Sequence, residues 1–171
     1  NAFFTRQIRP EARPVDPDPA ALISPCDAKL TVYPITPDSC FPIKQSLYRT
    51  GDLLGCHRLA RRFAGGQCLI FRLTVEDYHR YCPIALEGYN IYKRNCRSAC
   101  LIRTAHLGTI AMIEVGALMV GKIVNHHGAG NVRRGAEKGM FRFGGSTVVV
   151  LLQKDAAVLD PDILQNSAEG V

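Results

Sequence analysis

The sequence predicts a single β-rich α+β domain, in which mainly antiparallel strands are accompanied by a few short helices. Two observations support this prediction. Apolar runs rich in β-branched residues outnumber the amphipathic patterns that are typical of helices. The 171 residues contain no internal repeat and no linker-like stretch, and 47% of them are hydrophobic against 21% charged. This balance is typical of one globular domain with a sizeable core.

The expected elements follow from these patterns. Strands are expected in the apolar, β-branched segments 29–35, 68–75, 99–105, 109–115, 117–124 and 147–152. Short helices are expected at 45–54, ended by Gly55, at 58–63, ended by two glycines, and after Asp160-Pro161-Asp162. Residues 87–100 and 125–137 are polar or glycine-rich and are expected to be loops. The proline-rich residues 1–23 are expected to form an extended arm.

Glu114 is a single acid within an apolar strand segment. It either faces outward into solvent or is a buried, paired acid with a functional role. We expect the outward-facing arrangement.

Charge and cysteine content narrow the classes of partner. The net charge of +6 suits anionic partners such as lipid, and no nucleic-acid-binding module is recognisable, so nucleic acid is not an expected partner. Seven cysteines form no disulfide framework and include no Cys-x-x-Cys pair, so free thiols and no metal site are expected. The longest apolar stretch, 109–124, is interrupted by Glu114 and Lys122, so no membrane-spanning segment is expected.

Gly144-Gly145-Ser146-Thr147 precedes the last predicted strand and carries the most distinctive chemistry. Two glycines permit a sharp bend and close backbone approach. These residues alone fit a simple turn before a core strand, which is common. They also fit self-cleavage: the Ser146 hydroxyl attacks the Gly145 carbonyl, the amide becomes an ester, and elimination leaves a dehydroalanine that hydrolyses to a pyruvoyl group.

The rest of the chain favours the second interpretation, because its motifs resemble those of the phosphatidylserine decarboxylase family in the same order over nearly the whole length. These motifs are Phe3-Phe4-Thr5-Arg6, Arg9-Pro10, Ala12-Arg13-Pro14, Ser24-Pro25-Cys26-Asp27, Phe41-Pro42-Ile43-Lys44, Asp77-Tyr78-His79-Arg80, Glu114-Val115-Gly116-Ala117-Leu118-Met119-Val120-Gly121, Arg134-Gly135-Ala136-Glu137-Lys138-Gly139 and Phe143-Gly144-Gly145-Ser146-Thr147. The chain starts inside the entry motif, so we expect further residues upstream. By the same resemblance, Val171 precedes the last strand that such proteins usually have.

The resemblance implies a pyruvoyl-dependent lyase that converts phosphatidylserine to phosphatidylethanolamine. Cleavage between Gly145 and Ser146 would give a large part, 1–145, and a small part, 146–171. The pyruvoyl group derived from Ser146 would be the cofactor, with no metal and no pyridoxal phosphate. Asp27, His79 and Ser146 are the implied catalytic residues. In the family an aspartate at this place partners a histidine during self-cleavage, so we expect the three side chains to converge in one pocket.

One residue departs from the family pattern. Many members carry a second histidine three residues after His79, where this chain has Cys82. Either His79 serves both cleavage and decarboxylation, or Cys82 is an accessory residue, or processing is slow. Cys82 would need a lowered pKa to act as a base.

The expected partners are phosphatidylserine and an anionic membrane surface, which the protein binds peripherally on the cytoplasmic side of the membrane. The two cleaved parts are also expected to stay bound to each other. Homodimer formation is left open. Two alternatives are kept: a relative that decarboxylates a soluble amino acid, and an uncleaved, non-enzymatic β-rich binding module, which the Cys82 departure favours.

Overall fold

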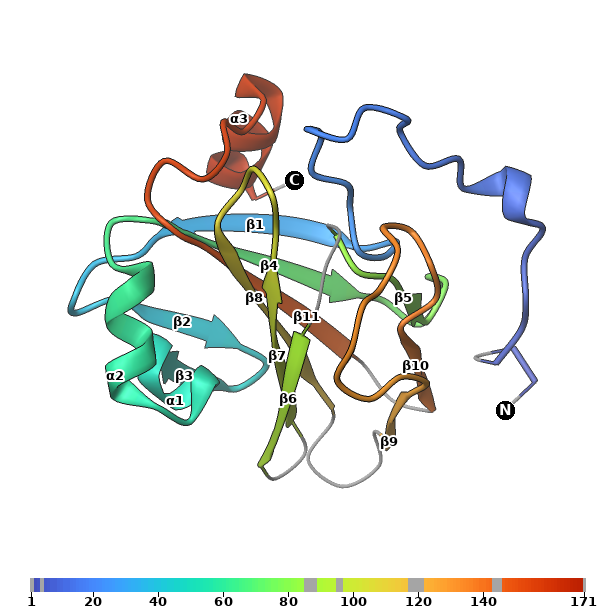
Figure 1. Ribbon diagram of the computed structural model, residues 1–171, viewed down its shortest axis with the longest axis horizontal. Coiled ribbons are helices and arrows are strands. Elements are labelled where there is room, and N and C mark those ends of the chain that lie inside the picture. Colours follow the sequence, from blue (N-terminus) through green and yellow to red (C-terminus); the bar gives the residue numbers. More distant parts are fainter. Residues whose placement is uncertain are drawn as a thin grey trace.

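The computed structural model describes residues 2–3, 5–84, 89–94, 97–116, 122–142 and 146–170. A six-stranded antiparallel sheet forms the body of the molecule (Figure 1). In order across this main sheet, its strands are β1 (Lys29–Pro34), β4 (Gln67–Leu73), β11 (Ser146–Leu152), β8 (Thr109–Val115), β7 (Arg97–Arg103) and β6 (Tyr89–Arg94). The β-rich fold expected from the sequence is therefore confirmed.

A three-stranded antiparallel sheet, the small sheet, packs against one face of the main sheet. Its order is β5 (Arg80–Tyr81), β10 (Gly139–Arg142) and β9 (Lys122–Asn125). A hairpin of β2 (Cys40–Ile43) and β3 (Ser46–Arg49) lies on the opposite side (Figure 1). The helices are η1 (Pro10–Ala12), α1 (Thr50–Leu54), α2 (His57–Ala60), η2 (Arg61–Phe63) and α3 (Pro161–Glu169).

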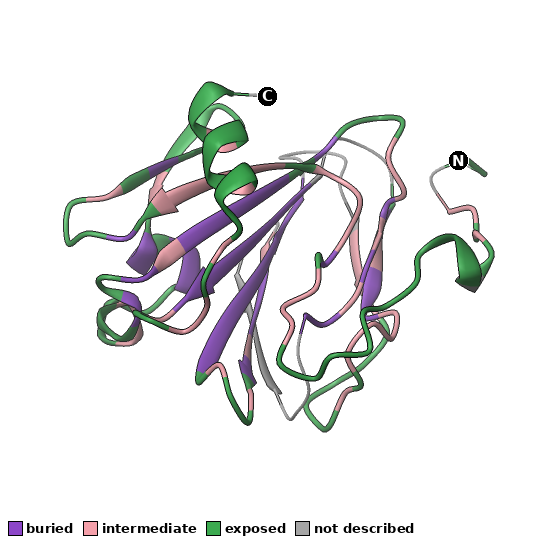
Figure 2. Cartoon of the chain, turned by 90° about the horizontal axis from the view of Figure 1, so that it is seen from above, coloured by how far each residue is buried: buried purple, intermediate pink, exposed green. Residues whose placement is uncertain are grey.

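The main sheet is buried on both faces, which explains the continuous apolar runs of its central strands. One hydrophobic cluster lies between the main and small sheets and includes Phe71, Val148 and Phe141. A second lies under the helices and the β2–β3 hairpin and includes Phe63 and Ile113. Figure 2 shows the buried strands inside and the exposed surfaces of α3 and the N-terminal arm outside.

Several expected elements are confirmed, with boundaries shifted by one or two residues. The segments 29–35, 68–75, 99–105, 109–115 and 147–152 correspond to β1, β4, β7, β8 and β11. Gly55 ends α1 in the left-handed conformation, with φ of 65°, as glycine does at many helix ends. The expected strand 117–124 falls partly on residues outside the described ranges; its last residues lie in β9.

Two expectations are wrong. Residues 46–49 form strand β3, so the helix expected over 45–54 begins only at Thr50. The loop expected over 87–100 contains strand β6 and the start of β7, which pair with each other in register. Local polarity suggested a loop there, whereas pairing with β7 at the edge of the main sheet makes this segment a strand.

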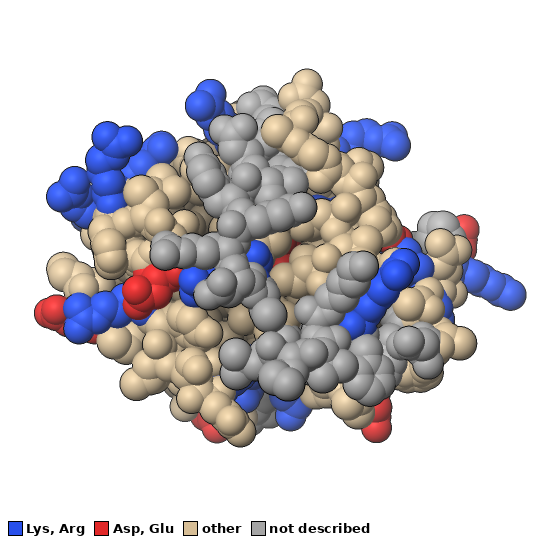
Figure 3. All heavy atoms as spheres, turned by 90° about the horizontal axis from the view of Figure 1, so that it is seen from below, with Lys and Arg blue, Asp and Glu red and all other residues tan. Residues whose placement is uncertain are grey.

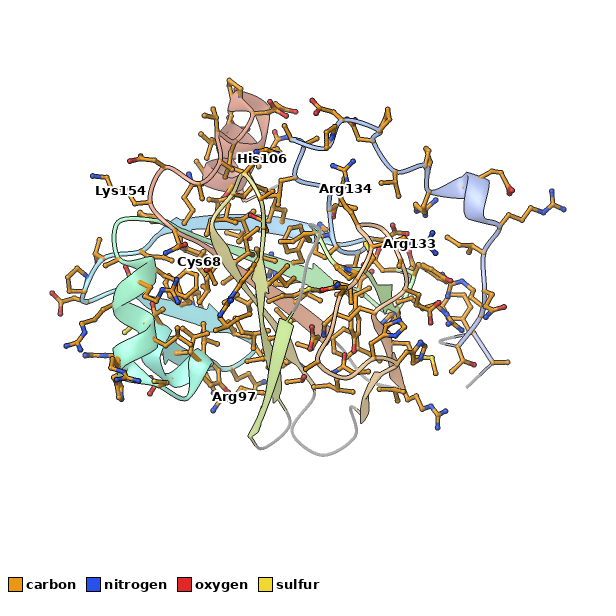
Figure 4. The ribbon with its side chains drawn as sticks, viewed as in Figure 1. Cys68, Arg97, His106, Arg133, Arg134 and Lys154 are labelled. Carbon is orange, nitrogen blue, oxygen red and sulfur yellow. The ribbon has the colours of Figure 1, made fainter. Side chains whose placement is uncertain are left out.

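The first 23 residues form an arm with the single 3-10 turn η1 among its described residues, as expected. Loop residue Arg134 holds the arm by donating from Nη1 to the Ala21 carbonyl at 2.7 Å. Figure 4 labels Arg134 on the loop between β9 and β10, beneath the arm. Arg6 adds a second attachment by donating to the Glu76 carbonyl at 3.0 Å. None of the helices in the described ranges is long and apolar enough to cross a membrane.

Candidate active site

Ser146 is the first residue of β11, the strand with β4 on one side and β8 on the other. The backbone register places Ser146 opposite Leu73, the last residue of β4, and Thr147 opposite Val115, the last residue of β8. Ser146 therefore lies at one end of the main sheet, where three strands begin or end together. The side chain of Ser146 and residues 143–145 lie outside the described part of the chain.

Two connections place the backbone of His79 close to this end of the main sheet. It follows β4 after a short turn in which the Asp77 amide donates to the Thr74 carbonyl at 3.3 Å. Its own carbonyl accepts a hydrogen bond of 2.9 Å from the amide of Phe141, in the strand that leads toward Ser146. The imidazole is fully buried.

The ring of His79 has a defined tautomer. Its Nδ1 lies 2.8 Å from the carbonyl oxygen of Asp77. Because a carbonyl oxygen only accepts, Nδ1 carries the hydrogen, and in the neutral form of the ring Nε2 holds the lone pair. Such an imidazole is suited to take a proton through Nε2.

Asp27 reaches the same end of the main sheet from the other side. It precedes β1 by two residues, and Lys29 of that strand pairs with Arg72, which in turn pairs with Thr147. The Asp27 carboxylate receives two hydrogen bonds from the arm residue Arg13, at 2.8 and 2.6 Å. In this structure its partner is therefore Arg13 and not His79.

Cys82 lies near Asp27 but is poorly suited to act as a base. Its sulfur is 3.8 Å from the carbonyl oxygen of Ser24, and its amide donates to the carbonyl of Pro25 at 2.9 Å. Burial raises the pKa of the Cys82 thiol to about 11. A thiol with that pKa provides almost no thiolate near neutral pH. The lowered pKa that Cys82 would need to act as a base is therefore not found.

Sequence reasoning missed a buried ion pair close to this site. Glu114 and Lys138 are almost completely inaccessible, and Lys138 Nζ lies 2.7 Å from Glu114 Oε1. The expectation that Glu114 faces outward is wrong. Glu114 pairs in register with Val148, two residues after Ser146, and Lys138 directly precedes β10. The pair therefore joins the two sheets beside the strand that starts at Ser146.

Polar neighbours complete this buried network. Lys138 Nζ also donates to Asn125 Oδ1 at 3.0 Å, and Asn125 Nδ2 donates to Ser98 Oγ at 2.9 Å. The ammonium group lies 5.3 Å from the centre of the Tyr81 ring, a cation–π distance. Burial raises the pKa of the Glu114 carboxyl, and Lys138 opposes this rise. The available signal was the single acid Glu114 within an apolar strand segment.

Gly139 follows Lys138 and shows how closely the small sheet is packed. A Cβ atom at this position would lie 2.2 Å from the Val124 carbonyl oxygen and 2.6 Å from Tyr81 Oη. No side chain fits at such distances, so glycine allows the strands of the small sheet to approach one another. The backbone that leads from Lys138 to Ser146 is therefore fixed by packing at its start.

Together, Asp27, His79 and Ser146 come to one end of the main sheet from sequence positions far apart. The structure thus brings their backbones to the same region, while Asp27 is bound to the arm. The convergence of all three side chains in one pocket stays a prediction. Within the described ranges, no cluster of three or more His, Cys, Asp or Glu side chains is arranged to hold a metal ion.

The fold and site define a β-rich protein organised around the strand that begins at Ser146. The family model described as phosphatidylserine decarboxylase matches residues 1–87 and 82–168. The chain is 42% identical over 190 aligned positions to phosphatidylserine decarboxylase proenzyme 2 of Clostridium acetobutylicum, covering 99% of this chain and 65% of the relative. It is 34% identical to the phosphatidylserine decarboxylase proenzymes of Ruminiclostridium cellulolyticum, with 99% and 65% covered, and of Chlamydia muridarum, with 100% and 65% covered. The chain belongs to the phosphatidylserine decarboxylase family.

These matches also differ from the chain in length. The chain spans about 65% of the length of these relatives. In addition, the alignments extend over 190 to 195 positions, more than the 171 residues of the chain. The two matched segments of the family model share residues 82–87. The relatives therefore have residues that this chain lacks.

Proposed function

We propose that this chain cleaves itself between Gly145 and Ser146 and then decarboxylates phosphatidylserine to phosphatidylethanolamine with the pyruvoyl group so formed. The observation that supports this most directly is the position of Ser146. It follows two glycines and opens a strand that is hydrogen-bonded on both sides, near a buried histidine whose Nε2 holds the lone pair. This position supports the proposal that the serine hydroxyl attacks its own preceding carbonyl.

In the cleavage step, His79 Nε2 would accept the proton of the Ser146 hydroxyl as oxygen attacks the Gly145 carbonyl carbon. The Gly145–Ser146 amide becomes an ester, the Ser146 nitrogen being protonated. Removal of the Ser146 α-proton expels the Gly145 carboxylate and leaves a dehydroalanine. Addition of water and loss of ammonia then complete the new amino-terminal pyruvoyl group. One histidine can serve these proton transfers because an imidazole ring can both accept and deliver a proton.

The pyruvoyl group, once formed, supplies an electron sink for the electron pair that decarboxylation leaves on the substrate. The residues of this chain would provide the other requirements. His79 would deliver a proton to the carbon that lost carbon dioxide. The Glu114–Lys138 pair would hold β8 and the start of β10 in place around the residue from which the group arises.

The cleaved parts would stay together because the small part keeps extensive contacts. Its strand β11 pairs with both β4 and β8 over most of its length. Its helix α3 adds a contact to β1, where Ser167 Oγ accepts from the Val32 amide at 2.8 Å. Peripheral binding to an anionic membrane surface would bring the lipid to the enzyme. Lys and Arg lie in several separate groups on the face shown in Figure 3.

Intact-mass measurement tests the cleavage. The purified chain should yield one fragment ending at Gly145 and another beginning at residue 146, and a carbonyl-reactive reagent should label only the small fragment. Ser146→Ala should stay intact, because alanine has no hydroxyl to form the ester. Ser46→Ala, at an exposed position of β3, is the matched control and should cleave normally. An unlabelled, uncleaved natural chain would favour the binding-module alternative.

Release of carbon dioxide from phosphatidylserine vesicles tests the activity. His79→Ala should abolish it. Normal cleavage in this variant would assign His79 to decarboxylation, whereas loss of cleavage would show that His79 is required to form the pyruvoyl group. Turnover of free serine with none of the lipid would instead assign the chain to the soluble amino-acid alternative.

A further inference from the structure

A cavity of about 550 Å³ lies between the arm and the body of the molecule. This volume is within the range of small-ligand sites. Its charged lining is formed by three arginines and two carboxylates, contributed by Arg9, Arg13, Arg80, Asp27 and Glu137. The remaining lining is largely apolar and includes Ile8, Val15, Ile23, Pro25 and Tyr78. The cavity thus combines cationic groups with apolar walls.

The three arginines differ in how they are bound. Arg80 is paired with Glu137 and also donates to the carbonyls of Thr5 and Arg6 at 2.9 and 3.1 Å. It is only 10% exposed. Its hydrogen bonds therefore fasten the arm to the body, and it has little capacity left for a ligand.

Arg13 and Arg9 are more accessible. The Arg13–Asp27 pair has side-chain exposures of 59% and 28%, and exposed ion pairs are weak because water competes for both groups. Arg9 is exposed, and its guanidinium forms no ion pair with any described residue. A ligand that offers an oxyanion to both arginines can therefore displace Asp27 without breaking a buried interaction.

We propose that this cavity binds the phosphate of a phosphodiester headgroup through Arg9 and Arg13, and that binding releases Asp27 from Arg13. Guanidinium groups match phosphate oxygens in geometry and charge, and two of them suit the single negative charge of a diester. The apolar walls accommodate the glycerol carbons next to the phosphate. This inference rests on the proposed function, since it identifies where the lipid substrate is held.

The exchange has a consequence for Asp27. The Arg13 hydrogen bonds occupy both oxygens of its carboxylate when the cavity holds no ligand. Once Arg13 turns to the phosphate, the carboxylate is free to receive a hydrogen bond from another donor at the same end of the main sheet. Substrate binding at the arm would thereby prepare Asp27 for its catalytic role.

The test measures binding by calorimetry with the 171-residue chain carrying Ser146→Ala, so that neither cleavage nor turnover is needed. The probe is glycerophosphoglycerol, which has the phosphodiester but neither the amine nor the carboxylate of the serine headgroup. The Arg9→Gln/Arg13→Gln double substitution should weaken binding by about tenfold or more, since charge-assisted hydrogen bonds are lost. Arg103→Gln, at an exposed position of β7, is the matched control and should bind like the reference protein.

Asp27→Asn should change the affinity in the opposite direction. It removes the group that competes with phosphate for Arg13, so affinity for glycerophosphoglycerol should increase. A purely structural role of the Arg13–Asp27 pair predicts no gain in affinity. Equal affinities in the reference protein, Arg9→Gln/Arg13→Gln and Asp27→Asn would overturn the proposal.

Two further binding measurements identify the source of the phosphate. Inorganic phosphate that binds as tightly as the diester, with the same dependence on Arg9 and Arg13, would show a general anion site and overturn the headgroup assignment. No binding of the soluble diester, combined with arginine-dependent binding to phosphatidylserine vesicles, would place these arginines on a membrane surface and also overturn it. Because the uncleaved protein is used, failure of the decarboxylase proposal would be seen separately, in the cleavage and carbon dioxide assays.

Discussion

Two ion pairs of this molecule have nearly the same length and opposite surroundings. Lys138 and Glu114 are 2.7 Å apart with exposures of 1% and 0%, whereas Arg13 and Asp27 are 2.6 Å apart with exposures of 59% and 28%. The first joins two sheets beside the strand of Ser146, and the second joins the arm to the body. Removing one partner of the buried pair leaves a charge that water cannot reach, which is costly for stability. Removing one partner of the exposed pair leaves a charge that water solvates, which costs little. The buried pair suits a fixed framework, and the exposed pair suits an exchangeable contact.

Removal of Lys138 should produce the largest effect. Lys138→Met leaves the Glu114 carboxyl buried without its cation, and breaking such pairs typically costs about 3–5 kcal/mol in the free energy of unfolding. Urea denaturation of the Ser146→Ala form measures this without interference from cleavage. The double variant Glu114→Gln/Lys138→Met should be more stable than Lys138→Met alone, because no lone buried charge is left. Additive effects of the two substitutions would contradict the coupling.

The same pair shows why sequence reasoning succeeded for the fold and failed for part of the site. The run of apolar residues around Glu114 indicates a buried strand, and β8 is one. A charged residue in such a run indicates an outward position unless a partner is known. That partner, Lys138, is 24 residues away, and only the packing of the small sheet on the main sheet brings the two together. Local patterns carry strand identity, whereas pairing between sheets depends on the tertiary fold.

The arm leads to the same conclusion. Its extended form follows from local proline content and was predicted. The residue to which Asp27 is bound was not, because the resemblance to the family suggests a histidine partner, and the contact with Arg13 depends on how the arm lies against the body. The polar segment around β6 was also misassigned, since pairing with β7 determines its structure. Elements defined by local sequence were predictable, and contacts between them were not.

A pH dependence should sharpen the contrast between the pairs. Burial raises the pKa of Glu114 in the folded state, and Lys138 counteracts part of this rise. A carboxyl with a raised folded-state pKa gives stability that is full below its unfolded pKa of about 4.3 and is lost as pH rises through the folded-state value. In Lys138→Met the raised pKa should rise further. The stability lost through Lys138→Met should therefore grow from pH 4 toward neutrality, and it should vary little with pH in the double variant.

Urea titrations at several pH values, each compared with the Ser146→Ala reference, measure this dependence. A loss of stability that is constant with pH would mean that Glu114 does not titrate in the folded state within that range.

Close packing next to Lys138 should give an intermediate effect. Gly139→Ala places a Cβ against the Val124 carbonyl and Tyr81, and such overpacking typically costs about 1–3 kcal/mol. The backbone of β10 would have to move, so self-cleavage should also slow. Gly128→Ala is the matched control, because a Cβ there has no heavy atom within 4 Å. Unfolding and cleavage time courses of both variants provide the measurement, and equal behaviour of the two would contradict the packing argument.

The exposed pair should give the smallest effect on stability. Arg13→Gln removes an ion pair that water already solvates, so the free energy of unfolding should change by about 0–1 kcal/mol, and less at high salt. The comparison with Lys138→Met uses the same assay and the same Ser146→Ala background. A loss as large as that of Lys138→Met would show that the arm is part of the rigid framework, and the exchange of Arg13 from Asp27 to a phosphate would then be too costly. A small loss in stability together with a large loss in phosphodiester affinity would separate ligand binding from folding at this residue.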